Sequence, residues 1–377
     1  MMPHAHIAGF GGNVAGAIPI GTYVVGGAGM KANVGSGGGS FLSTTPTFSG
    51  GTYDIIDAVW NPTYSNFVLL GNPTSGAQDA AKAILTSTDG VSFASPSGSG
   101  DSTIPATQPK NRLHLWSNGN IGTNYCASGN ALSTNGAASF TSQNAIGNGG
   151  YATGWIGSGN NGCICGDFSS GSYFAYTTTG YSTYTNSQTH TVLLGITTSL
   201  FLNGNYIFGS GGTSLAYGTT ASQTALTTIT GNLGSTLLGG VWDGTGYCIF
   251  GATSLSTAST IGGTYTSRTT AFFTTAGMTG NISAMATDGA GNIIAGTDTG
   301  DVAISTDHGV TWTKLSGTAN PLSGGVIKGI QYLLSNFWIY GSVSTNGAVA
   351  FSATGTAFTN LPLAGFTGNA VLALAGH

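Results

Sequence analysis

The sequence predicts an all-β fold, a β-propeller made of four-stranded antiparallel blades. Three observations support this prediction. The composition is poor in helix formers, one short motif recurs along the chain at a nearly constant interval, and turn-forming residues divide each repeat into short segments.

The composition favours strands and turns over helices. Among 377 residues there are 65 Gly but only 10 Pro, charged residues make up 5%, and every acidic residue is Asp. Glu, Lys and Arg are the usual helix formers at exposed positions, so we expect almost no helix. The chain is also 40% hydrophobic and 10% aromatic, which is too apolar for a disordered chain and sufficient for a buried core.

The repeating motif consists of three mostly apolar residues followed by Gly. It occurs as YVVG (23–26), VLLG (68–71), CASG (126–129), CICG (163–166), YIFG (206–209), CIFG (248–251), IIAG (293–296) and WIYG (338–341). Most successive glycines are 42 to 45 residues apart, and the exceptions are intervals of 58 and 37. A repeat of about 45 residues is typical of propeller blades.

Each repeat contains four candidate strands. In the best-defined unit, SAMA (283–286) precedes the motif IIAG, and the turn DGAGN (288–292) joins them. The segment DVAIST (301–306) follows, and VTWTKL (310–315) closes the unit. This order predicts an antiparallel sheet of four short strands.

The two ends of the chain predict how the ring closes. AVLALAGH (370–377) resembles the first strand of a blade, and GTYVVGG (21–27) resembles the second strand of one. Pairing them would close the ring and remove free sheet edges. We therefore expect eight blades, with seven as the alternative, in one domain over 21–377 after an N-terminal arm (1–20). A surface insertion is expected near 95–112. A β-solenoid is the competing fold, but its coils usually repeat at shorter intervals.

The segment ISTDHGVTWTKL (304–315) lies between the expected third and fourth strands of its unit. It contains Ser305, Asp307, Gly309, Thr311 and Trp312 in the pattern S-x-D-x-G-x-T-W. An Asp side chain can accept hydrogen bonds from backbone N–H groups of a turn, and Gly permits a positive φ. We therefore interpret the segment as a structural turn whose aromatic residue packs between blades.

Weaker copies of this pattern occur at the same place in other units. They comprise Ser87, Asp89, Gly90, Ser92 and Phe93; Ser133, Asn135, Gly136, Ser139 and Phe140; Ser352, Thr354, Gly355 and Phe358; and Thr177, Gly180, Ser182 and Tyr184. The pattern resembles the Asp-box repeat of bacterial neuraminidases and sortilin-like receptors. The resemblance implies a propeller in which these turns lie on the outer rim, away from the axial channel.

The neuraminidase resemblance does not extend to catalysis. That family uses three arginines and a Tyr–Glu pair, whereas this chain has only Arg112 and Arg268 and no Glu. Glycoside hydrolysis needs two spaced carboxyl groups. The only close pairs here are Asp54/Asp57 and Asp298/Asp301, and the second pair lies in an expected turn. The histidines have no partner visible in the sequence, so we expect no enzyme activity and no cofactor.

Other classes of function are also disfavoured. A net charge of −4 with seven basic residues argues against nucleic-acid binding. No apolar run is long enough for a membrane-spanning helix, and the N-terminus does not resemble a secretory signal. The four cysteines lack the spacing of a metal site, and we expect buried, reduced thiols and no bound metal.

Aromatic and hydroxyl-bearing residues leave glycan binding as one option. Tyr173, Tyr176, Tyr181 and Tyr184 form the densest aromatic group in the sequence and are candidates for stacking on sugars. Period-two spacing in strands would, however, bury about half of such a set.

The low charge and the abundance of Gly, Ser, Thr, Asn and Ala resemble tailed-bacteriophage virion proteins, such as propeller-containing tail, fibre or head-decoration components. The resemblance implies a non-enzymatic structural or attachment protein that forms homo-oligomers on the particle. It implies assembly in the host cytoplasm, work outside the cell, and other virion proteins and a host glycan or receptor as partners. The alternative is a free carbohydrate-binding propeller lectin.

Overall fold

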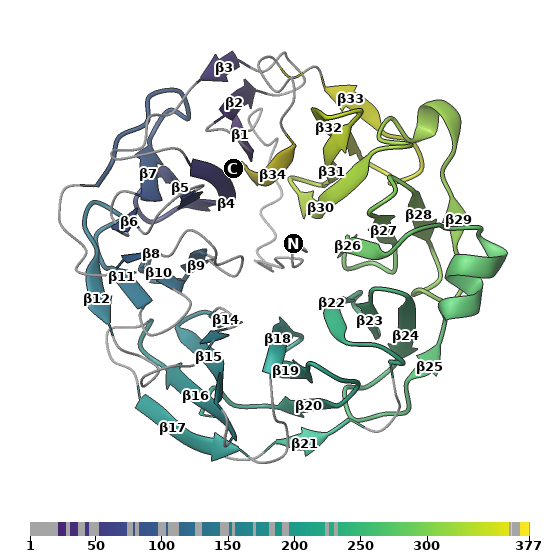
Figure 1. Cartoon of the computed structure of the whole chain (residues 1–377), viewed down its shortest axis with the longest axis horizontal. Helices are drawn as coiled ribbons and strands as arrows, with labels where there is room; N and C mark the ends of the chain where they lie inside the picture. Colours follow the sequence, from purple (N-terminus) through teal and green to yellow (C-terminus); the bar gives the residue numbers. More distant parts are fainter. Residues whose placement is uncertain are drawn as a thin grey trace.

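A ring of β-sheets surrounds a central axis in the computed structural model of the chain (Figure 1). The model describes residues 22–27, 31–36, 42–44, 53–73, 78–79, 83–96, 103–104, 113–124, 130–143, 151–152, 155–168, 171–180, 185–190, 196–222, 226–229, 233–361, 363 and 370–376. The expected arm (1–20) and most of the expected insertion near 95–112 lie outside these residues.

The sheets follow one another around the ring in chain order. The first sheet contains β34 (Val371–Gly376), β1 (Thr22–Gly27), β2 (Lys31–Ser36) and β3 (Leu42–Thr44), and the second contains β4 (Tyr53–Asn61), β5 (Asn66–Pro73) and β7 (Ile84–Ser87). The third contains β9 (Leu113–Leu115), β10 (Ile121–Asn124), β11 (Asn130–Ser133) and β12 (Thr141–Gln143). The fourth contains β13 (Tyr151–Ala152), β14 (Ile156–Ser158), β15 (Asn161–Phe168), β16 (Gly171–Thr177) and β17 (Thr185–His190).

The remaining four sheets form the second half of the ring. They contain β18 (Ile196–Leu202), β19 (Asn205–Ser210), β20 (Leu215–Gly218) and β21 (Thr227–Thr228); then β22 (Leu237–Trp242), β23 (Tyr247–Gly251), β24 (Ser254–Ala258) and β25 (Thr266–Ser267). The last two contain β26 (Ile282–Thr287), β27 (Ile293–Thr297), β28 (Val302–Ser305) and β29 (Thr313–Lys314); then β30 (Val326–Leu333), β31 (Asn336–Val343), β32 (Asn346–Ser352) and β33 (Thr359–Leu361). In each sheet the first strand lies nearest the axis (Figure 1).

The structure corrects the expectation of eight four-stranded blades. Seven sheets have the full set of strands, in agreement with the alternative of seven complete blades, and one of these has its inner position divided between β13 and β14. The sheet β4-β5-β7 has three strands among the described residues. At its outer edge, Thr86 and Ala94 exchange both backbone hydrogen bonds, at 2.9 and 3.0 Å. A separate pair, β6 (Gln78–Asp79) with β8 (Thr103–Ile104), lies in the long connections that follow β5 and β7.

The two ends of the chain close the ring, as predicted. β34 pairs antiparallel with β1, and Leu374 lies opposite Val25. The C-terminal segment is thus the inner strand of a sheet whose other strands come from the N-terminal part of the chain.

The recurring glycine has a packing role between neighbouring sheets. A Cβ atom on Gly209 would lie 2.6 Å from Cβ of Leu237, on the inner strand of the next sheet, and one on Gly296 would lie 2.8 Å from Cγ2 of Ile327. Gly26 stands in the same relation to Ile55. These distances are too short for two carbon atoms, so at these three positions the motif ends in Gly because the next blade packs directly against its backbone. At Gly341 an added Cβ would instead meet the carbonyl oxygen of Val326 on the inner strand of the same blade.

The inner strands carry a repeated irregularity beside this contact. The register of pairing with the second strand shifts just after Ile55, Ile196, Leu237, Ile282 and Ile327. Such bulges bend a strand and turn a side chain toward a new direction. Here the residue before each shift is a buried aliphatic residue of the core between blades.

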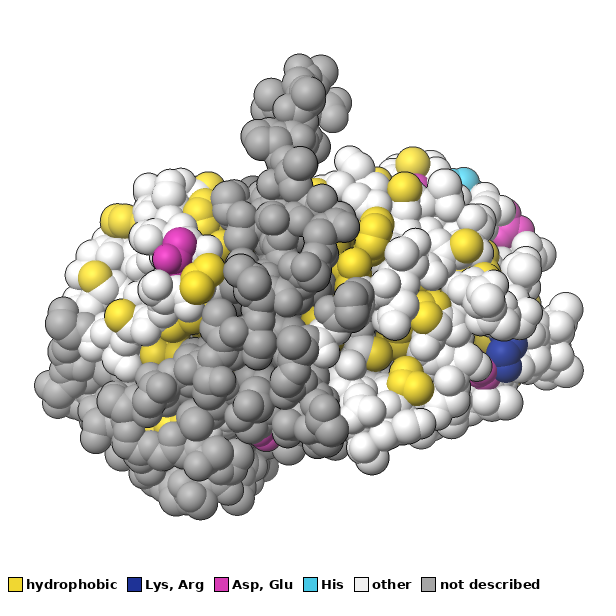
Figure 2. Space-filling model, turned by 90° about the horizontal axis from the view of Figure 1, so that it is seen from above, with side chains coloured by type: hydrophobic (Ala, Val, Ile, Leu, Met, Phe, Trp, Pro, Cys, Tyr) yellow, Lys and Arg dark blue, Asp and Glu magenta, His cyan; other side chains and the backbone are white. Residues whose placement is uncertain are grey.

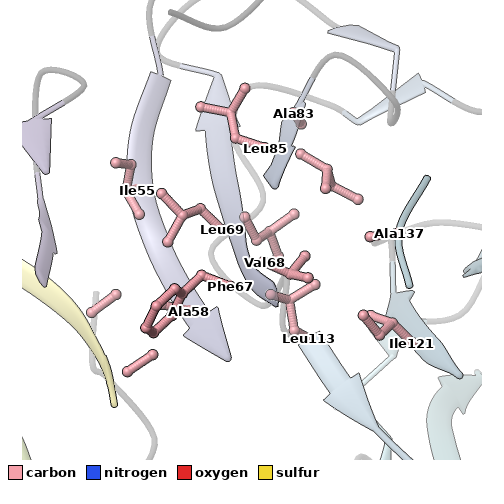
Figure 3. Packing of buried hydrophobic residues seen from close by; sticks show 14 of the residues in the cluster. Ile55, Ala58, Phe67, Val68, Leu69, Ala83, Leu85, Leu113, Ile121 and Ala137 are labelled. Carbon is pink, nitrogen blue, oxygen red and sulfur yellow. The ribbon is translucent and has the colours of Figure 1, made fainter. Parts of the chain in front are cut away.

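The core consists of apolar side chains that fill the spaces between adjacent sheets. In one cluster, Ile55, Leu69 and Leu85 of the three-stranded sheet lie with Leu113 and Ile121 of the next sheet (Figure 3). Ala373 and Ala375 of β34 belong to the same cluster. Each blade is therefore stabilised by its two neighbours.

Helix is almost absent from the described residues, as the composition predicts. The helical elements named there are a π-helix at Thr270–Thr275 and a 3-10 helix at Gly317–Ala319, and Ala83 also has 3-10 conformation. Both named elements lie in connections that lead from one blade to the next.

The antiparallel order of strands gives the ring two distinct faces. The turns between first and second strands and between third and fourth strands lie on one face, here called the turn face. The turns between second and third strands, and the connections between blades, lie on the other, here called the crossover face.

Candidate functional site

The turn from Ser305 to Trp312 lies on the turn face, where the sequence analysis placed it. The Ser305 hydroxyl donates to Oδ1 of Asp307 (2.8 Å) and accepts from the N–H of Gly309 (2.8 Å). Asp307 accepts from the backbone and the hydroxyl of Thr311, at 2.8 and 2.6 Å. The side chains of Ser305 and Asp307 therefore hold the turn together from inside.

Two weaker copies make similar hydrogen bonds. Ser87 donates to Asp89 and accepts from the N–H of Gly90, both at 2.8 Å, while Asp89 accepts from the N–H groups of Val91 and Ser92. In the third sheet, Ser133 donates to Asn135 (2.9 Å), and Asn135 accepts from the N–H of Ser139 (3.0 Å). We call the turns that contain Asp307 and Asp89 the Ser–Asp turns.

The remaining copies retain less of this network. The hydroxyl of Ser352 accepts from the N–H of Gly355 (2.9 Å), and Thr177 accepts from the N–H of Thr179 (3.2 Å). In neither copy does a carboxylate hold the turn.

The aromatic residue at the end of each turn packs against the preceding blade. Trp312 is 6% exposed and lies edge-on to Phe272, with ring centroids 5.1 Å apart. It shares a core cluster with Val241, Cys248 and Phe250 of the neighbouring sheet. Phe140 and Phe358 take the same position in their blades, and Phe93 is half-buried against its cluster.

These hydrogen bonds favour the ionised carboxylates. The N–H groups of Ser92 and Val91, with the hydroxyl of Ser87, lower the pKa of Asp89 to about 2. Burial opposes ionisation of Asp307, but hydrogen bonds from Thr311, Ser305 and Val310 outweigh it and hold its pKa below the ordinary value. Both groups therefore remain charged at neutral pH.

The carboxylate pairs considered for catalysis hold structural elements together on the other face. Asp298 accepts from the backbone and the side-chain amide of Asn281, at 2.8 and 2.9 Å. Asp301 accepts from the backbone and the hydroxyl of Thr279 and forms an ion pair with Lys314 at 2.7 Å. This turn is thus fastened to the connection entering the same blade.

In the other pair, Asp54 and Asp57, the structural contacts are those of Asp57. Asp57 is 9% exposed and accepts from the N–H groups of Ala58 and Leu113, both at 2.9 Å, which joins two neighbouring sheets. Asp54 lies three residues earlier on β4 and is half-buried.

The structure gives His308 a partner that the sequence does not reveal. Nδ1 of His308 lies 2.9 Å from Oδ2 of Asp243, a carboxylate that is 1% exposed in the β22–β23 turn of the neighbouring blade. Thr245 contacts the same nitrogen at 2.8 Å. The expectation that this histidine stands alone is therefore wrong, because residues 65 positions apart in the sequence meet only when two blades pack side by side.

Similar contacts join the turn face elsewhere. Asn120 donates to the carbonyl of Gly180 (2.6 Å), and Asn66 donates to the carbonyl of Gly136 (2.6 Å). In each case, the turn between first and second strands of one blade binds the turn between third and fourth strands of the next. The polar turns therefore fasten adjacent blades together.

Of the four tyrosines proposed for glycan stacking, Tyr176 is the one whose side chain the structure describes. Tyr176 on β16 is half-buried and packs against a core cluster of its blade. Tyr173 lies on the same strand, opposite Gly166, and its side chain is outside the described part, as are Tyr181 and Tyr184.

The sequence analysis missed a different set of aromatic residues. Four inner strands carry an aromatic residue at the same position beside the turn to the second strand, namely Trp60, Phe201, Trp242 and Tyr332. One further pair follows Trp60, Phe201 and Tyr332 before this turn, and after Trp242 the hydrogen bond from the N–H of Asp243 to the carbonyl of Gly246 takes that place. Each of the four aromatic residues is partly exposed. Trp242 and Tyr332 each lie nine residues before the glycine of their motif, but Trp60 and Phe201 lie eleven and eight residues before theirs. The pairing register is therefore needed to align all four.

The described residues contain no group of three or more His, Cys or Asp side chains placed to hold a metal ion. Cys163, Cys165 and Cys248 are buried free thiols, and burial raises the pKa of Cys163 and Cys248. In the same part of the chain, no helix has the length and apolar character needed to cross a membrane.

Comparison with known proteins supports the fold. No protein-family model and no curated protein sequence matches the chain. Among solved structures, the computationally designed protein Ika8 matches with a TM-score of 0.59 and 11% identity, over 92% of this chain and 95% of that one. Sqt1 of Saccharomyces cerevisiae matches with a TM-score of 0.59 and 8% identity, over 84% and 87%.

AztD of Citrobacter koseri gives a similar result, with a TM-score of 0.57 and 9% identity over 95% of this chain and 98% of that one. These structural similarities show a shared β-propeller fold. At identities this low, the function has to be argued from the residues themselves.

Proposed function

We propose that the chain is a non-enzymatic structural and attachment component of a virion, such as a tail, fibre or head-decoration protein, in which the propeller is a docking module. The observation that carries this proposal is the use made of the carboxylates. Asp57, Asp89, Asp243, Asp288, Asp298, Asp301 and Asp307 all accept hydrogen bonds within turns or between elements.

A group committed to holding a turn is poorly placed to act as a general acid or base. Catalytic carboxylates usually need a reacting group within hydrogen-bonding distance and a pKa near the working pH. The pKa values of Asp89, Asp301 and Asp307 are instead shifted downward. This arrangement supports a rigid scaffold whose loops bind a partner, and it is the behaviour expected of an Asp-box propeller.

The virion assignment rests on the composition of the chain. Charged residues make up only 5% of it, and Gly, Ser, Thr, Asn and Ala dominate the remainder. The proposed partners are other virion proteins, further copies of this chain on the particle, and a host glycan or receptor. The proposed site of action is the assembled virion, formed in the host cytoplasm and later released.

The test is fractionation of a lysate from the source on a density gradient, followed by mass spectrometry of each band. Chymotrypsin should be used because seven Lys and Arg residues yield few tryptic peptides. Co-migration with nucleic-acid-containing particles is the expected result. Peptides confined to the soluble fraction would contradict the proposal and favour the free lectin instead.

A further inference from the structure

Four partly exposed aromatic residues lie at equivalent positions on the turn face. Trp60 lies opposite Phe67, Phe201 opposite Tyr206, Trp242 opposite Tyr247, and Tyr332 opposite Phe337. The ring centroids of the four pairs are 4.6 to 4.8 Å apart. In every pair the second-strand residue is at most 3% exposed, so the buried ring supports the partly exposed one. We call Trp60, Phe201, Trp242 and Tyr332 the aromatic rim.

The fold itself does not require aromatic residues at this position. In three other blades the equivalent residues are Leu115, Gly157 and Thr287, opposite Ile121, Gly162 and Ile293. All three are partly exposed, like the members of the aromatic rim. Trp60, Phe201 and Trp242 also pack against core clusters between blades, and among the described residues Tyr332 belongs to no such cluster. Because Gly and Thr can occupy the position, blade packing alone does not require a ring there.

The turn face also carries the most exposed large apolar side chains. Tyr64, Val91, Val310 and Tyr332 are 36 to 44% exposed, and they are the exposed large hydrophobic residues of the described chain. Tyr64 lies in the β4–β5 turn, Val91 and Val310 lie in Ser–Asp turns, and Tyr332 belongs to the aromatic rim. None of the four lies on the crossover face. Among the described residues, large apolar side chains with this much exposure thus lie on the turn face, which makes it the candidate binding surface.

Charge on this face limits the ligands that it can accept. No described Lys or Arg lies in any turn of the turn face, whereas Asp89, Asp243, Asp288 and Asp307 lie there. Lys314 forms its ion pair with Asp301 near the crossover face. In the view of Figure 2, histidine atoms (cyan) lie at the upper edge of the ring, and Lys or Arg atoms (dark blue) lie in its lower half. Phosphates, sulfates and sialic acids would therefore meet only like charge on the turn face.

The other groups on the turn face are neutral. Its turns are rich in Thr, Ser, Asn and Gly, whose hydroxyl, amide and backbone groups can exchange hydrogen bonds with sugar hydroxyls. Aromatic faces beside such groups suit the C–H faces of sugar rings. An extended chain of sugars could contact Phe201 and Trp242 on adjacent blades and reach Tyr332 two blades further on.

We infer that the turn face binds an uncharged oligosaccharide, with the aromatic rim as its stacking platform. Phe201, Trp242 and Tyr332 lie on β18, β22 and β30, within four consecutive blades, and form the main part of the site. The inference rests on the proposed function, for which it names the chemical class of the host-side receptor.

The experiment uses the full chain and a panel of uncharged oligosaccharides, namely glucans, mannans, galactans and chitooligosaccharides of four to six sugar units. Sialylated and sulfated oligosaccharides of similar length serve as charge controls. Binding is measured by titration calorimetry. The variants are Trp242→Leu and Tyr332→Ala, with Leu115→Ala as the matched control because it changes the same position in a blade without a ring. A denaturation curve of each variant shows whether the fold is retained.

We expect saturable binding of at least one uncharged oligosaccharide by the wild type and by Leu115→Ala. Binding by Trp242→Leu and Tyr332→Ala should be roughly tenfold weaker. The denaturation midpoint of Tyr332→Ala should be nearly unchanged, whereas Trp242→Leu should lower it, because Trp242 packs against the cluster that contains Leu237 and Tyr247. Absence of binding to every uncharged member, preference for the anionic controls, or equal affinity in all variants would each overturn the inference.

The outcome is separable from that of the proposed function. Co-migration with particles, without sugar binding, would overturn the oligosaccharide site and leave the virion assignment standing. Sugar binding at the aromatic rim by a protein confined to the soluble fraction would support the site and overturn the virion assignment.

Discussion

Trp312 shows how one side chain can serve both a turn and the contact between blades. Its indole N–H donates to the carbonyl of Gly309 at 3.0 Å, while its ring packs edge-on against Phe272 in the neighbouring core. We expect Trp312→Ala to lower the free energy of unfolding by about 3 kcal/mol or more, because it leaves a cavity between two blades. Chemical denaturation measures this loss.

Val310→Ala is the matched control for that experiment. Val310 lies in the same turn but is 37% exposed, so its truncation removes little buried surface. Equal stability of Trp312→Ala and Val310→Ala would show that Trp312 does not contribute to the core.

Gly296 tests the packing role of the recurring motif. A Cβ atom at this position would lie 2.8 Å from Cγ2 and 3.0 Å from Cγ1 of Ile327. Gly296→Ala should therefore destabilise the protein by about 1–3 kcal/mol through overpacking. Gly212→Ala is the control, since the nearest atom to its added Cβ would be Oγ of Ser210 at 3.7 Å. Similar losses in both variants, measured by thermal denaturation, would contradict this role.

The turns respond to pH through their carboxylates. The folded pKa of Asp89 is lowered from 3.8 to about 2, and those of Asp301 and Asp307 are also lowered. A depressed folded pKa means that the unfolded chain takes up protons first as the pH falls. The stability that these groups contribute is thus fully present above about pH 4 and is lost as the pH falls toward 2.

Denaturation midpoints measured at a series of pH values check this expectation. Asp307→Asn should flatten the acid limb of the curve, because the amide can still accept hydrogen bonds but does not titrate. A curve that falls equally steeply in wild type and Asp307→Asn would show that the turn does not contribute to the acid sensitivity.

Contacts between turns explain why parts of the candidate site could not be predicted from the sequence. The motif ending in Gly, the four-strand order and the turn at Asp307 depend on local patterns, and the sequence predicted the second strands of most blades from them. The partner of His308 depends instead on how two blades pack. The aromatic rim depends on register, because Trp60 and Phe201 lie eleven and eight residues before the glycine of their motif, whereas Trp242 and Tyr332 each lie nine residues before theirs. Strand pairing is needed to place all four at equivalent positions.

The number of complete blades was hard to predict for a related reason. Gly71 and Gly129 are 58 residues apart, and the sheet β4-β5-β7, which contains Gly71, has three strands among the described residues. Counting motifs identifies units along the chain, but it cannot show whether each unit has enough strand-forming residues to complete its sheet.

Closure of the ring determines the stability of the whole molecule. β34 supplies the inner strand beside β1, and Val371, Ala373, Leu374 and Ala375 are at most 4% exposed. These residues lie in the core on both sides of their sheet, with Ile55 in one cluster and with Trp338 and Tyr340 in another. Because each blade is stabilised by its neighbours, loss of one inner strand exposes apolar surface on two adjacent blades.

Removal of residues from Val371 onward should therefore abolish the single cooperative unfolding transition, and exposed edges should promote association. The measurement combines thermal unfolding with size-exclusion chromatography. Adding a synthetic peptide with the sequence of Val371–Gly376 in excess should restore part of the transition, because the edge of β1 can still pair with it. A truncated chain that unfolds cooperatively at the wild-type midpoint would show that β34 is dispensable, and that contacts between blades suffice to hold an open ring.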